Sequence, residues 1–486
     1  MAVNSLRPLK PAAFDYWKAQ HLLNRAGFGG TPDQVQALAS MGLNDAVDYI
    51  VNYESIAEEP VPVERWDASI IRPPTDEERE RARTARRNND EATLEQIQRE
   101  RNRRTAADRR QMAEIQKWWI RRMIETGRPL EEKMTLFWHG HFATSYRTIE
   151  DSWHCLLQNQ LFRSHATGSF AKLCFGIIRD PAMLEYLDND ENRRRSPNEN
   201  LARELMELFI LGEGNDYTEQ DIREGARALT GYSFEDDRFV FNAREHDDGP
   251  KRILGKTGTF NGDDFVRIVL SRPVASEFLA WKLYRYFVND RPGMPDEATR
   301  GFILKLAKEV RDRDYELKPV LRTLFRSEHF YDRDNVGSLI KSPVQLVVQA
   351  IRTMRTPARD LSALAAACDL MGQNLFFPPN VKGWDGGRAW INTSTMFVRQ
   401  NIVVYLLTGR RPNAYAWQED GATFDPMHLV SHLDSADGGP PAVTDTVTYL
   451  VRFLLAGPPR PERVEEMVAF VERNGGRVDR NVAIAL

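Results

Sequence analysis

Hydrophobic residues recur every three to four positions along most of this chain, which is the spacing expected of helices with a buried face. Helix-start signals agree with this periodicity, since Thr31 and Gln34 make a capping box around a proline at the first helical position. A strand-like pattern is confined to residues 232–241, where two short apolar segments flank Asp236 and Asp237. We therefore expect a mainly α fold, a large multi-helix globular structure with one short β-hairpin near 232–241.

A second pattern is the loss of hydrophobic residues between 76 and 111, where nearly every position is charged or polar. Oppositely charged residues four positions apart support a solvated helix there, as in Glu77/Arg81, Glu95/Arg99 and Glu100/Arg104. The segment predicts a protruding helix or helical hairpin. The functional alternative is an arm that docks a partner protein.

These changes of composition divide the chain into four parts. We expect N-terminal helices in 1–74, a charged helical insertion in 75–114, and a main helical domain in 115–409 that carries the polar site. The remaining segment, 410–486, is assigned to an irregular linker followed by C-terminal helices.

The most informative helix pattern lies in residues 197–211, PNENLARELMELFIL. Drawn at 100° per residue, its polar side chains fall on one narrow stripe of an otherwise apolar cylinder, and they are Asn200, Arg203, Glu204 and Glu207. A helix that is apolar nearly all round is buried, so we expect this stripe to face an internal pocket. Buried charges must pair, bind a metal or shift their pKa values, and such positions are enriched in functional sites.

Structural explanations compete with a functional one in this segment. Arg203 and Glu207 stand four residues apart and can form an ion pair that only joins neighbouring helices. Glu199 completes a capping box with Ser196 as the N-cap, which gives Glu199 a structural role and removes it from the candidate site.

A His-x-His pair in the sequence LFWHGHF points to a metal site. In a continuous helix His139 and His141 would lie about 200° apart and would not share a ligand. Gly140 is a natural residue for ending a helix, and a helix that ends there lets both imidazoles turn toward one centre. We expect either this arrangement, with His246 as a further ligand, or histidines that are hydrogen-bonded within the core.

Other polar and aromatic residues extend the candidate site. Asp188 follows a predicted helix and Asn198 precedes the stripe, and both join Asn200 as candidate substrate-binding residues. The proline- and glycine-rich segment 375–393 contains Trp384, and an aromatic loop of this kind either lines a ligand pocket or covers the side of a helical core. The candidate catalytic residues are Glu204, Glu207, Arg203 and His141, with Trp384 among the binding residues.

Composition narrows the function classes. The net charge of −4 supplies no overall positive charge to attract nucleic acid or anionic lipid. The three cysteines are unevenly spaced, which argues against a disulfide framework or a cysteine zinc site and favours buried thiols. The N-terminus has no apolar segment of signal-peptide length, and no run of about 18 apolar residues occurs. We expect a cytoplasmic protein that does not bind nucleic acid or span a membrane.

Six motifs, in this order along the chain, resemble the bacterial family catalogued as domain of unknown function 1800. They cover nearly the whole chain: QHLLNRAGFG (20–29), LFWHGHF (136–142), DPAMLEYLDND (180–190), PNENLARELMELFILGEG with YTEQDIREGARALTGY (197–232), HDDGPKRILG (246–255) and LFFPPNVKGW (375–384). The chain departs from the family pattern at Gly140, where members often have asparagine, and in the charged segment 76–111. It also lacks the export signal that many relatives carry.

The resemblance implies a mainly helical fold but brings no established activity. Genes of the family often neighbour a gene for a protein of the alkaline-phosphatase-like class, so the resemblance implies a partner of that class.

Our leading hypothesis is an enzyme with a buried His/carboxylate site, either metal-dependent or metal-free, that performs hydrolysis or oxidation. A mixed His/carboxylate site suits zinc, iron or manganese. Without a metal, Glu204 or Glu207 with a histidine can perform general acid–base catalysis while Arg203 holds an anionic group. The alternative hypothesis is a non-catalytic helical scaffold that binds a partner protein or a glycan through residues 76–111 and the tryptophan-containing segment.

Overall fold

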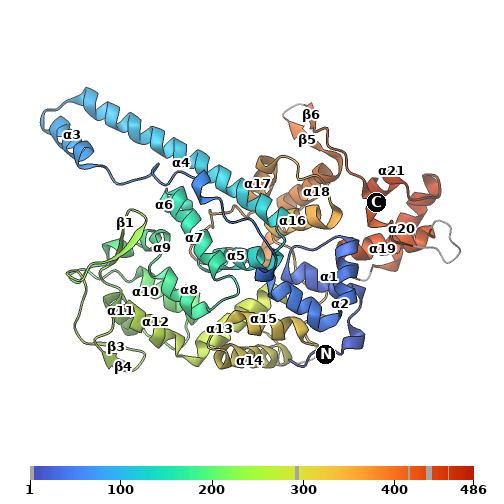
Figure 1. Ribbon diagram of the computed structural model, residues 1–486, viewed down its shortest axis with the longest axis horizontal. Helices are drawn as coiled ribbons and strands as arrows, with labels where there is room; N and C mark the ends of the chain where they lie inside the picture. Colours follow the sequence, from blue (N-terminus) through green and yellow to red (C-terminus); the bar gives the residue numbers. More distant parts are fainter. Residues whose placement is uncertain (1–4, 291–294, 414–415, 434–440, 458, 486) are drawn as a thin grey trace.

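The computed structural model of the protein describes residues 5–290, 295–413, 416–433, 441–457 and 459–485. Helices dominate these residues, and the strands among them form three separate two-stranded antiparallel pairs (Figure 1). The prediction of a mainly α fold is therefore confirmed. Cys155, Cys174 and Cys368 are buried free thiols, as expected.

The N-terminal helices are α1 (Tyr16–Ala26) and α2 (Pro32–Val51), which pack against each other. The predicted capping box of Thr31 and Gln34 is present at the start of α2. Gly42 has a φ of 76° and is not helical, so α2 consists of two helical segments that meet at a kink. Asp48 of α2 forms ion pairs with two arginines of α15 (Leu317–Arg326), which ties this end of the chain to the main body.

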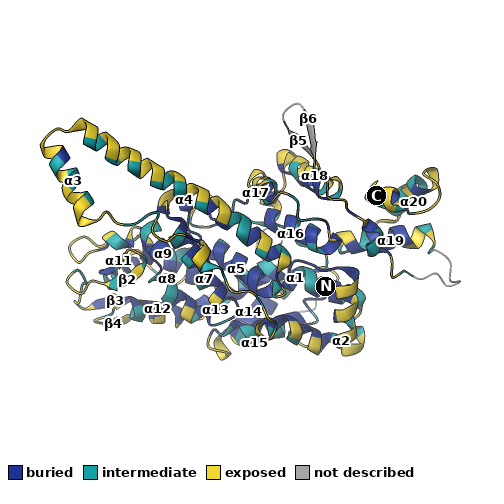
Figure 2. Ribbon diagram, turned by 45° about the horizontal axis from the view of Figure 1, so that its top comes forward, coloured by how far each residue is buried: buried dark blue, intermediate teal, exposed yellow. Residues whose placement is uncertain are grey.

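The charged segment forms a helical hairpin of α3 (Asp76–Arg87) and α4 (Glu91–Glu125) that projects from the body (Figure 1). Its distal part is exposed, whereas α4 becomes buried from Asp108 and Met112 onward as it enters the core (Figure 2). The prediction of a protruding charged hairpin is confirmed. The boundary drawn at residue 114 lies inside α4, because one unbroken helix carries both the arm and the first core residues.

Helix α5 (Pro129–His141) lies at the centre of the molecule and is buried on almost every side. One hydrophobic core packs on its Phe137 and Trp138 face and contains residues from α1, α2 and most of the helices between α8 and α15. A second core packs on its Leu136 side and contains residues of α4 and of the helices α16 to α18. Helix α5 therefore separates two cores, and side chains on its two faces enter different surroundings.

Most of the helices that follow α5 along the chain contribute to the first core, whereas Tyr146 and Ile149 of α6 belong to the second. Their bounds are α6 (Tyr146–Ile149), α7 (Ser152–Ser164), α8 (Phe170–Ile177), α9 (Pro181–Tyr186), α10 (Asn200–Glu204), α11 (Glu219–Ala228), α12 (Gly262–Leu270), α13 (Pro273–Phe287) and α14 (Glu297–Asp312). A π-helix, Leu205–Ile210, continues directly from α10. The helices α16 (Pro343–Met354), α17 (Leu361–Leu370) and α18 (Thr393–Thr408) form the second core with the end of α4.

The expected hairpin near 232–241 is confirmed by β1 (Tyr232–Glu235) and β2 (Arg238–Phe241), which pair across Asp236 and Asp237. A second pair was not predicted: β3 (Lys251–Ile253) and β4 (Lys256–Gly258). Its turn is made by Leu254 and Gly255, both with positive φ, in a segment too short to show alternation. A third pair, β5 (Arg410–Asn413) and β6 (Ala416–Glu419), lies where the sequence indicated an irregular linker.

The C-terminal helices are α19 (Val443–Leu455), α20 (Pro461–Arg473) and α21 (Arg480–Ala485). Helix α19 packs on α1, where the Tyr16 and Tyr449 hydroxyls are 2.7 Å apart and Gln20 donates to the carbonyl of Phe453. The two ends of the chain are thus joined. Among the described residues, no helix combines the length and the apolar character that crossing a bilayer requires.

Candidate active site

The helix with the polar stripe differs from its prediction in where it starts and how it turns. Ser196 forms an isolated bridge with Arg193 instead of capping the helix, and the Asn198 side chain accepts the hydrogen bond from the Asn200 N–H at 3.0 Å. Helix α10 begins at Asn200, and the π-helix takes over at Leu205. The predicted capping box of Ser196 and Glu199 is therefore wrong, because Asn198 takes the capping role two residues later.

The expectation that the stripe is buried is also wrong. Asn200 is exposed, and Arg203, Glu204 and Glu207 are only half-buried. Arg203 forms ion pairs with Glu207 at 3.1 Å and with Glu219 of α11 at 2.7 Å.

Arg203 also pairs with Glu199 at 3.1 Å. Its hydrogen bonds to Glu219, Glu207 and Glu199 raise the pKa of its guanidinium. These ion pairs match the structural explanation of the stripe, because they let Arg203 join α10 to α11.

The two carboxylates of the stripe have different surroundings. Burial and the neighbouring charge of Glu207 raise the pKa of Glu204, although Arg203 and Lys382 act in the opposite direction. Glu207 lines a groove that continues into the central cleft described below. Of the four stripe residues, Glu207 is thus the one that reaches this groove.

Asp188, Asn198 and Asn200 form a local polar network. The Asn198 amide donates to the carbonyl of Asp188 at 3.2 Å, and the Asn200 amide lies 3.5 Å from the Asp188 carboxylate. Asp188 has a positive φ of 54° at the start of a short turn. These contacts fix the loop that precedes α10, and none of the three residues lines the central cleft.

Of the two arrangements expected for His139 and His141, the structure has histidines that are hydrogen-bonded within the core, and the two imidazoles do not turn toward one centre. Helix α5 continues through His141, so the two imidazoles enter the two different cores. His139 accepts a hydrogen bond from the Phe376 N–H at 3.0 Å, and His141 donates to the Phe209 carbonyl at 2.9 Å. Burial lowers the pKa of each imidazole to about 3, with the charge of Lys282 as a further cause at His141.

His246 lies elsewhere, with Nδ1 2.8 Å from the carbonyl of Thr230 beside the β1–β2 hairpin. Within the described parts of the chain, no three His, Cys, Asp or Glu side chains gather closely enough to hold a metal ion. The three histidines proposed as metal ligands therefore do not fit a shared metal centre.

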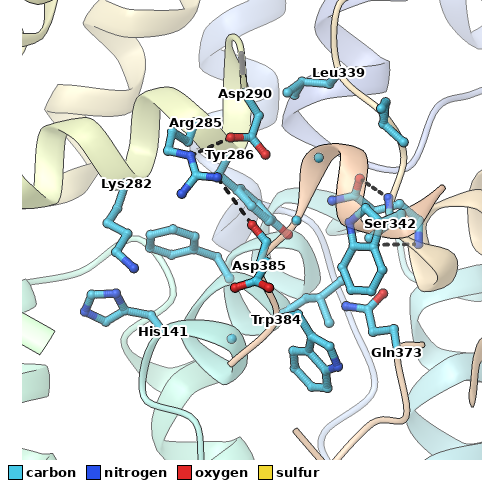
Figure 3. Close-up of a pocket in the computed structure, with 18 of the residues that line it drawn as sticks. His141, Lys282, Arg285, Tyr286, Asp290, Leu339, Ser342, Gln373, Trp384 and Asp385 are labelled. Carbon is cyan, nitrogen blue, oxygen red and sulfur yellow. Dashed lines mark hydrogen bonds and ion pairs between the residues drawn. The ribbon is translucent and has the colours of Figure 1, made fainter. Parts of the chain in front are cut away.

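A central cleft lies between α5, α13, the segment before α16 and the tryptophan loop (375–393), and it encloses about 160 Å³ (Figure 3). Two of the predicted site residues, His141 and Trp384, line it. Most of its other polar lining residues come from helix α13 and from the loops: Lys282, Arg285, Tyr286, Asp290, Ser342, Gln345, Gln373, Lys382 and Asp385.

Close backbone contacts hold the tryptophan loop over α5. Gly383 has a φ of 77°, and any side chain at this position would collide with the carbonyl of Gly140. The Trp384 ring then lies 5.6 Å from the ring of His139. On the opposite wall, the Tyr286 hydroxyl donates to the carbonyl of Lys133 at 2.9 Å. Two glycines and one tyrosine therefore set the width of the cleft.

His141 and Lys282 both line the cleft, and their side chains lie near each other on one side of it (Figure 3). Because the Phe209 carbonyl can only accept, the proton of His141 is on Nε2 and Nδ1 carries a lone pair. This buried Nδ1 has no hydrogen-bond partner among the described residues. The Lys282 ammonium lies 5.1 Å from the centroid of the Phe278 ring, and burial lowers its pKa to about 8, assisted by the charge of Arg285.

The remaining charges of the cleft form a connected group. Arg285 pairs with the Asp290 carboxylate and donates to the Asp385 carbonyl at 3.3 Å. Lys382 pairs with Glu213 at 2.5 Å at the outer end. The cleft thus combines a neutral imidazole and an ammonium with a pKa near neutrality.

Sequence reasoning missed Lys282, Arg285 and Asp290. The sequence does contain one signal, WKLYRYFVND, in which Lys282 and Arg285 interrupt an aromatic helix face. Their pairing with a loop about 100 positions later depends on tertiary structure, which no local pattern contains.

Residues 21–485 match the family described as "Protein of unknown function (DUF1800)", and the chain belongs to this family. The resemblance inferred from the six motifs is thereby confirmed over nearly the whole chain. No curated protein and no solved structure matches the chain significantly.

Proposed function

We propose that the protein is an enzyme that performs metal-free acid–base chemistry, of the hydrolytic kind, on a polar substrate bound in the central cleft. The observation that carries this proposal is the Nδ1 of His141, which has no hydrogen-bond partner among the described residues and lies near the Lys282 ammonium in the cleft. A buried polar atom without a partner costs free energy, and such costs are concentrated at functional sites.

The two side chains have complementary roles in hydrolysis. His141 is neutral near pH 7 because burial lowers its pKa to about 3, so its Nδ1 can accept the proton that the water loses as it attacks the substrate. Lys282 has a pKa of about 8, which is close to the value that favours proton transfer near neutral pH. We assign Lys282 as the proton donor to the leaving group. Asp385 and Trp384 line the same space and contact the substrate.

This assignment predicts the pH dependence of the reaction. The protonated form of Lys282 is the donor, so activity should fall as the pH rises through about 8. Glu207 lines the groove that leads into the cleft, and we assign it to contact the part of the substrate that lies in this groove.

Hydrolysis of p-nitrophenyl acetate and p-nitrophenyl phosphate tests the proposal. Lys282→Met should lower kcat/KM by about 100-fold through loss of the general acid, with an unchanged circular dichroism spectrum. His141→Ala should have a similar effect. The matched control is Lys308→Met, because Lys308 is exposed on α14 and pairs only with Asp312. Wild-type rates in Lys282→Met, or no turnover of either ester by the wild type, would overturn the hydrolytic proposal.

A second candidate function is favoured by the α3–α4 arm, which projects into solvent (Figure 1). In this alternative the protein is a scaffold, and the arm docks a partner protein, for which an alkaline-phosphatase-like protein encoded nearby is the candidate, or a glycan. If removal of the arm abolishes a cellular phenotype that Lys282→Met leaves intact, the scaffold function is supported instead of the enzyme.

A further inference from the structure

A groove opens from the central cleft and encloses about 540 Å³, compared with about 160 Å³ for the cleft itself. The two spaces are continuous, because several residues line both of them: His141, Lys282, Arg285, Lys382, Trp384 and Asp385. Binding sites for small molecules usually measure about 300–1,000 Å³. The cleft alone therefore holds only the reacting group of a substrate, and the rest of the substrate has to extend into the groove.

Helix α13 leads from the groove into the cleft. Val274, Phe278 and Trp281 lie on one side of this helix, and they line the groove but not the cleft. Lys282, further along the helix, lines both spaces. At about 1.5 Å per residue, about 12 Å of helix separates Val274 from Lys282. The wall made by α13 thus changes from apolar to charged where the groove meets the cleft.

The other walls of the groove are also largely apolar. Leu208 and Leu211 come from the π-helix and the residue that ends it. Ile303 and Leu304 come from α14, which packs against α13. Leu304 is 41% exposed to solvent. Apolar surface that is open to water gains free energy when an apolar group covers it, so these side chains favour an apolar ligand.

The acidic side chains of the groove already have partners. Glu207 pairs with Arg203 at 3.1 Å, and Glu213 pairs with Lys382 at 2.5 Å. Because its carboxylate is paired, Glu207 contacts a ligand in the groove through its methylene groups. The other polar residues that belong to the groove alone are exposed or half-buried and can stay in contact with water: Asn215, Glu277 and Arg300.

The aromatic rings of α13 contact each other and two cations. Phe278 and Trp281 stack with their ring centroids 6.0 Å apart. The Lys282 ammonium lies 5.1 Å from the Phe278 centroid, and the Arg285 guanidinium lies 4.9 Å from the Trp281 centroid. A sugar ring needs an open aromatic face to stack on, whereas an alkyl chain packs against ring edges and leucine side chains. The groove therefore suits an alkyl chain better than a glycan.

We propose that the groove binds the alkyl chain of an acyl ester whose ester group lies in the cleft beside His141 and Lys282. The chain extends from the ester carbonyl along α13, past Trp281 and Phe278. This inference rests on the proposed function and names the class of its substrate.

The reaction on such a substrate is an ordinary ester hydrolysis. Water adds to the carbonyl carbon and gives one proton to Nδ1 of His141. The bond between the carbonyl carbon and the leaving oxygen breaks, and this oxygen takes a proton from Lys282. The products are a fatty acid and an alcohol, and return of a proton from His141 to Lys282 through water restores the enzyme.

Hydrolysis of p-nitrophenyl acetate, butyrate and octanoate tests the chain-binding role. The wild-type kcat/KM should rise about tenfold or more from acetate to octanoate, because each additional buried methylene adds binding free energy. Leu304→Asp should lower the octanoate-to-acetate ratio of kcat/KM by about fivefold or more, because it places a charge in the groove. Leu304→Gln, which adds no charge, should lower the ratio less.

The matched control is Leu454→Asp, because Leu454 of α19 is 37% exposed and does not line the groove. This control should keep the wild-type ratio, and all three variants should keep the wild-type circular dichroism spectrum. A wild-type kcat/KM that does not depend on chain length, or a wild-type ratio in both Leu304 variants, would overturn the inference.

Calorimetric titration with octanoate and butyrate separates this inference from the proposed function, because it needs no turnover. Octanoate should bind the wild type and the Leu454→Asp control about tenfold or more tightly than butyrate, and Leu304→Asp should lose this preference. Maltose that binds in place of octanoate would contradict the alkyl assignment. If esters are hydrolysed through Lys282 at every chain length alike, only this inference fails. If octanoate binding depends on Leu304 but no ester is turned over, the hydrolytic proposal fails and the chain-binding groove stands.

Discussion

At the scale of single residues, Glu132 shows how this fold stabilises a buried charge. Its side chain is fully buried and accepts hydrogen bonds from Arg163 at 2.7 Å, Arg122 at 2.6 Å and the Trp119 indole at 2.8 Å. Burial disfavours the carboxylate, but the two arginines more than offset it, and the pKa of Glu132 lies below its ordinary value. The carboxylate joins α4, α5 and α7.

Replacement of Glu132 by alanine should destabilise the protein by about 3–5 kcal/mol, because it removes the ion-pair partner of the buried Arg163 and leaves Arg122 with only its longer pair to Glu131 at 3.5 Å. Urea unfolding followed by circular dichroism measures this loss. Glu132→Gln retains the shape and part of the hydrogen bonding, so a smaller loss is expected there. A cost below about 1 kcal/mol for the alanine variant would show that the arginines find other partners.

Some residues of the candidate site could be predicted from the sequence, and others could not. His141 and Trp384 were recognised from their motifs and do line the cleft. The shared metal geometry failed because Gly140 does not end the helix, so the histidine rings stay on different faces.

At the scale of elements, the helix that carries the polar stripe explains why a regular projection failed. The projection assumed 100° per residue from 197 to 211, but the helix begins at Asn200 and widens into a π-helix at Leu205. A π-helix turns through a smaller angle per residue, yet Arg203 and Glu207 still form the ion pair that their four-residue spacing predicted. Arg203, before the change, points to α11, whereas Glu207 reaches the groove.

The α3–α4 arm gives a prediction at this scale. Replacing residues 79–103 by a short glycine linker removes exposed helix and leaves Asp108 and the buried end of α4 in place. Asp108 accepts hydrogen bonds from Tyr146 and from the Ser152 N–H, which hold α4 to the body. We expect the Tm to change by no more than about 3 °C, measured by differential scanning calorimetry.

A loss of cooperative unfolding in the shortened protein would mean that the arm contributes to the core. The matched control is Asp108→Ala in the full-length chain, which should be destabilised because two buried donors lose their acceptor.

At the scale of the whole molecule, the ends of the chain meet in one interface. Tyr449 and Phe453 of α19 belong to the first core, whereas α20 and α21 contribute to a small satellite core around Val447, Val471 and Val482. Arg452 lies 3.9 Å from the centroid of the Trp17 ring. Helix α19 is therefore part of the main body, although the sequence assigned it to a separate C-terminal part.

Two truncations test this organisation. A chain that ends at residue 457 keeps α19 and should remain cooperatively folded. A chain that ends at residue 433 uncovers α1 around Tyr16 and Gln20, and its Tm should fall by about 5 °C or more. Size-exclusion chromatography and thermal unfolding provide the measurements, and equal behaviour of the two chains would contradict the role given to α19.

The overall helical class and the charged arm were predictable because each follows from local periodicity and charge pairing. The arrangement of the helices in space was not predictable. The sequence of α5 mixes apolar and polar residues, although the helix is buried on almost every side. Residues such as Glu132 and Lys133 look like surface residues in the sequence and are buried only through contacts with distant segments.

The walls of the central cleft come from four segments that are far apart along the chain, near 136–141, 282–290, 339–345 and 373–390. Contacts of such high sequence separation form late in folding, because closing long loops costs chain entropy before any contact is gained. The cleft is thus a late product of folding, and a ligand held by all four walls would have to leave before they separate. Saturating ligand should therefore slow unfolding far more than it speeds folding.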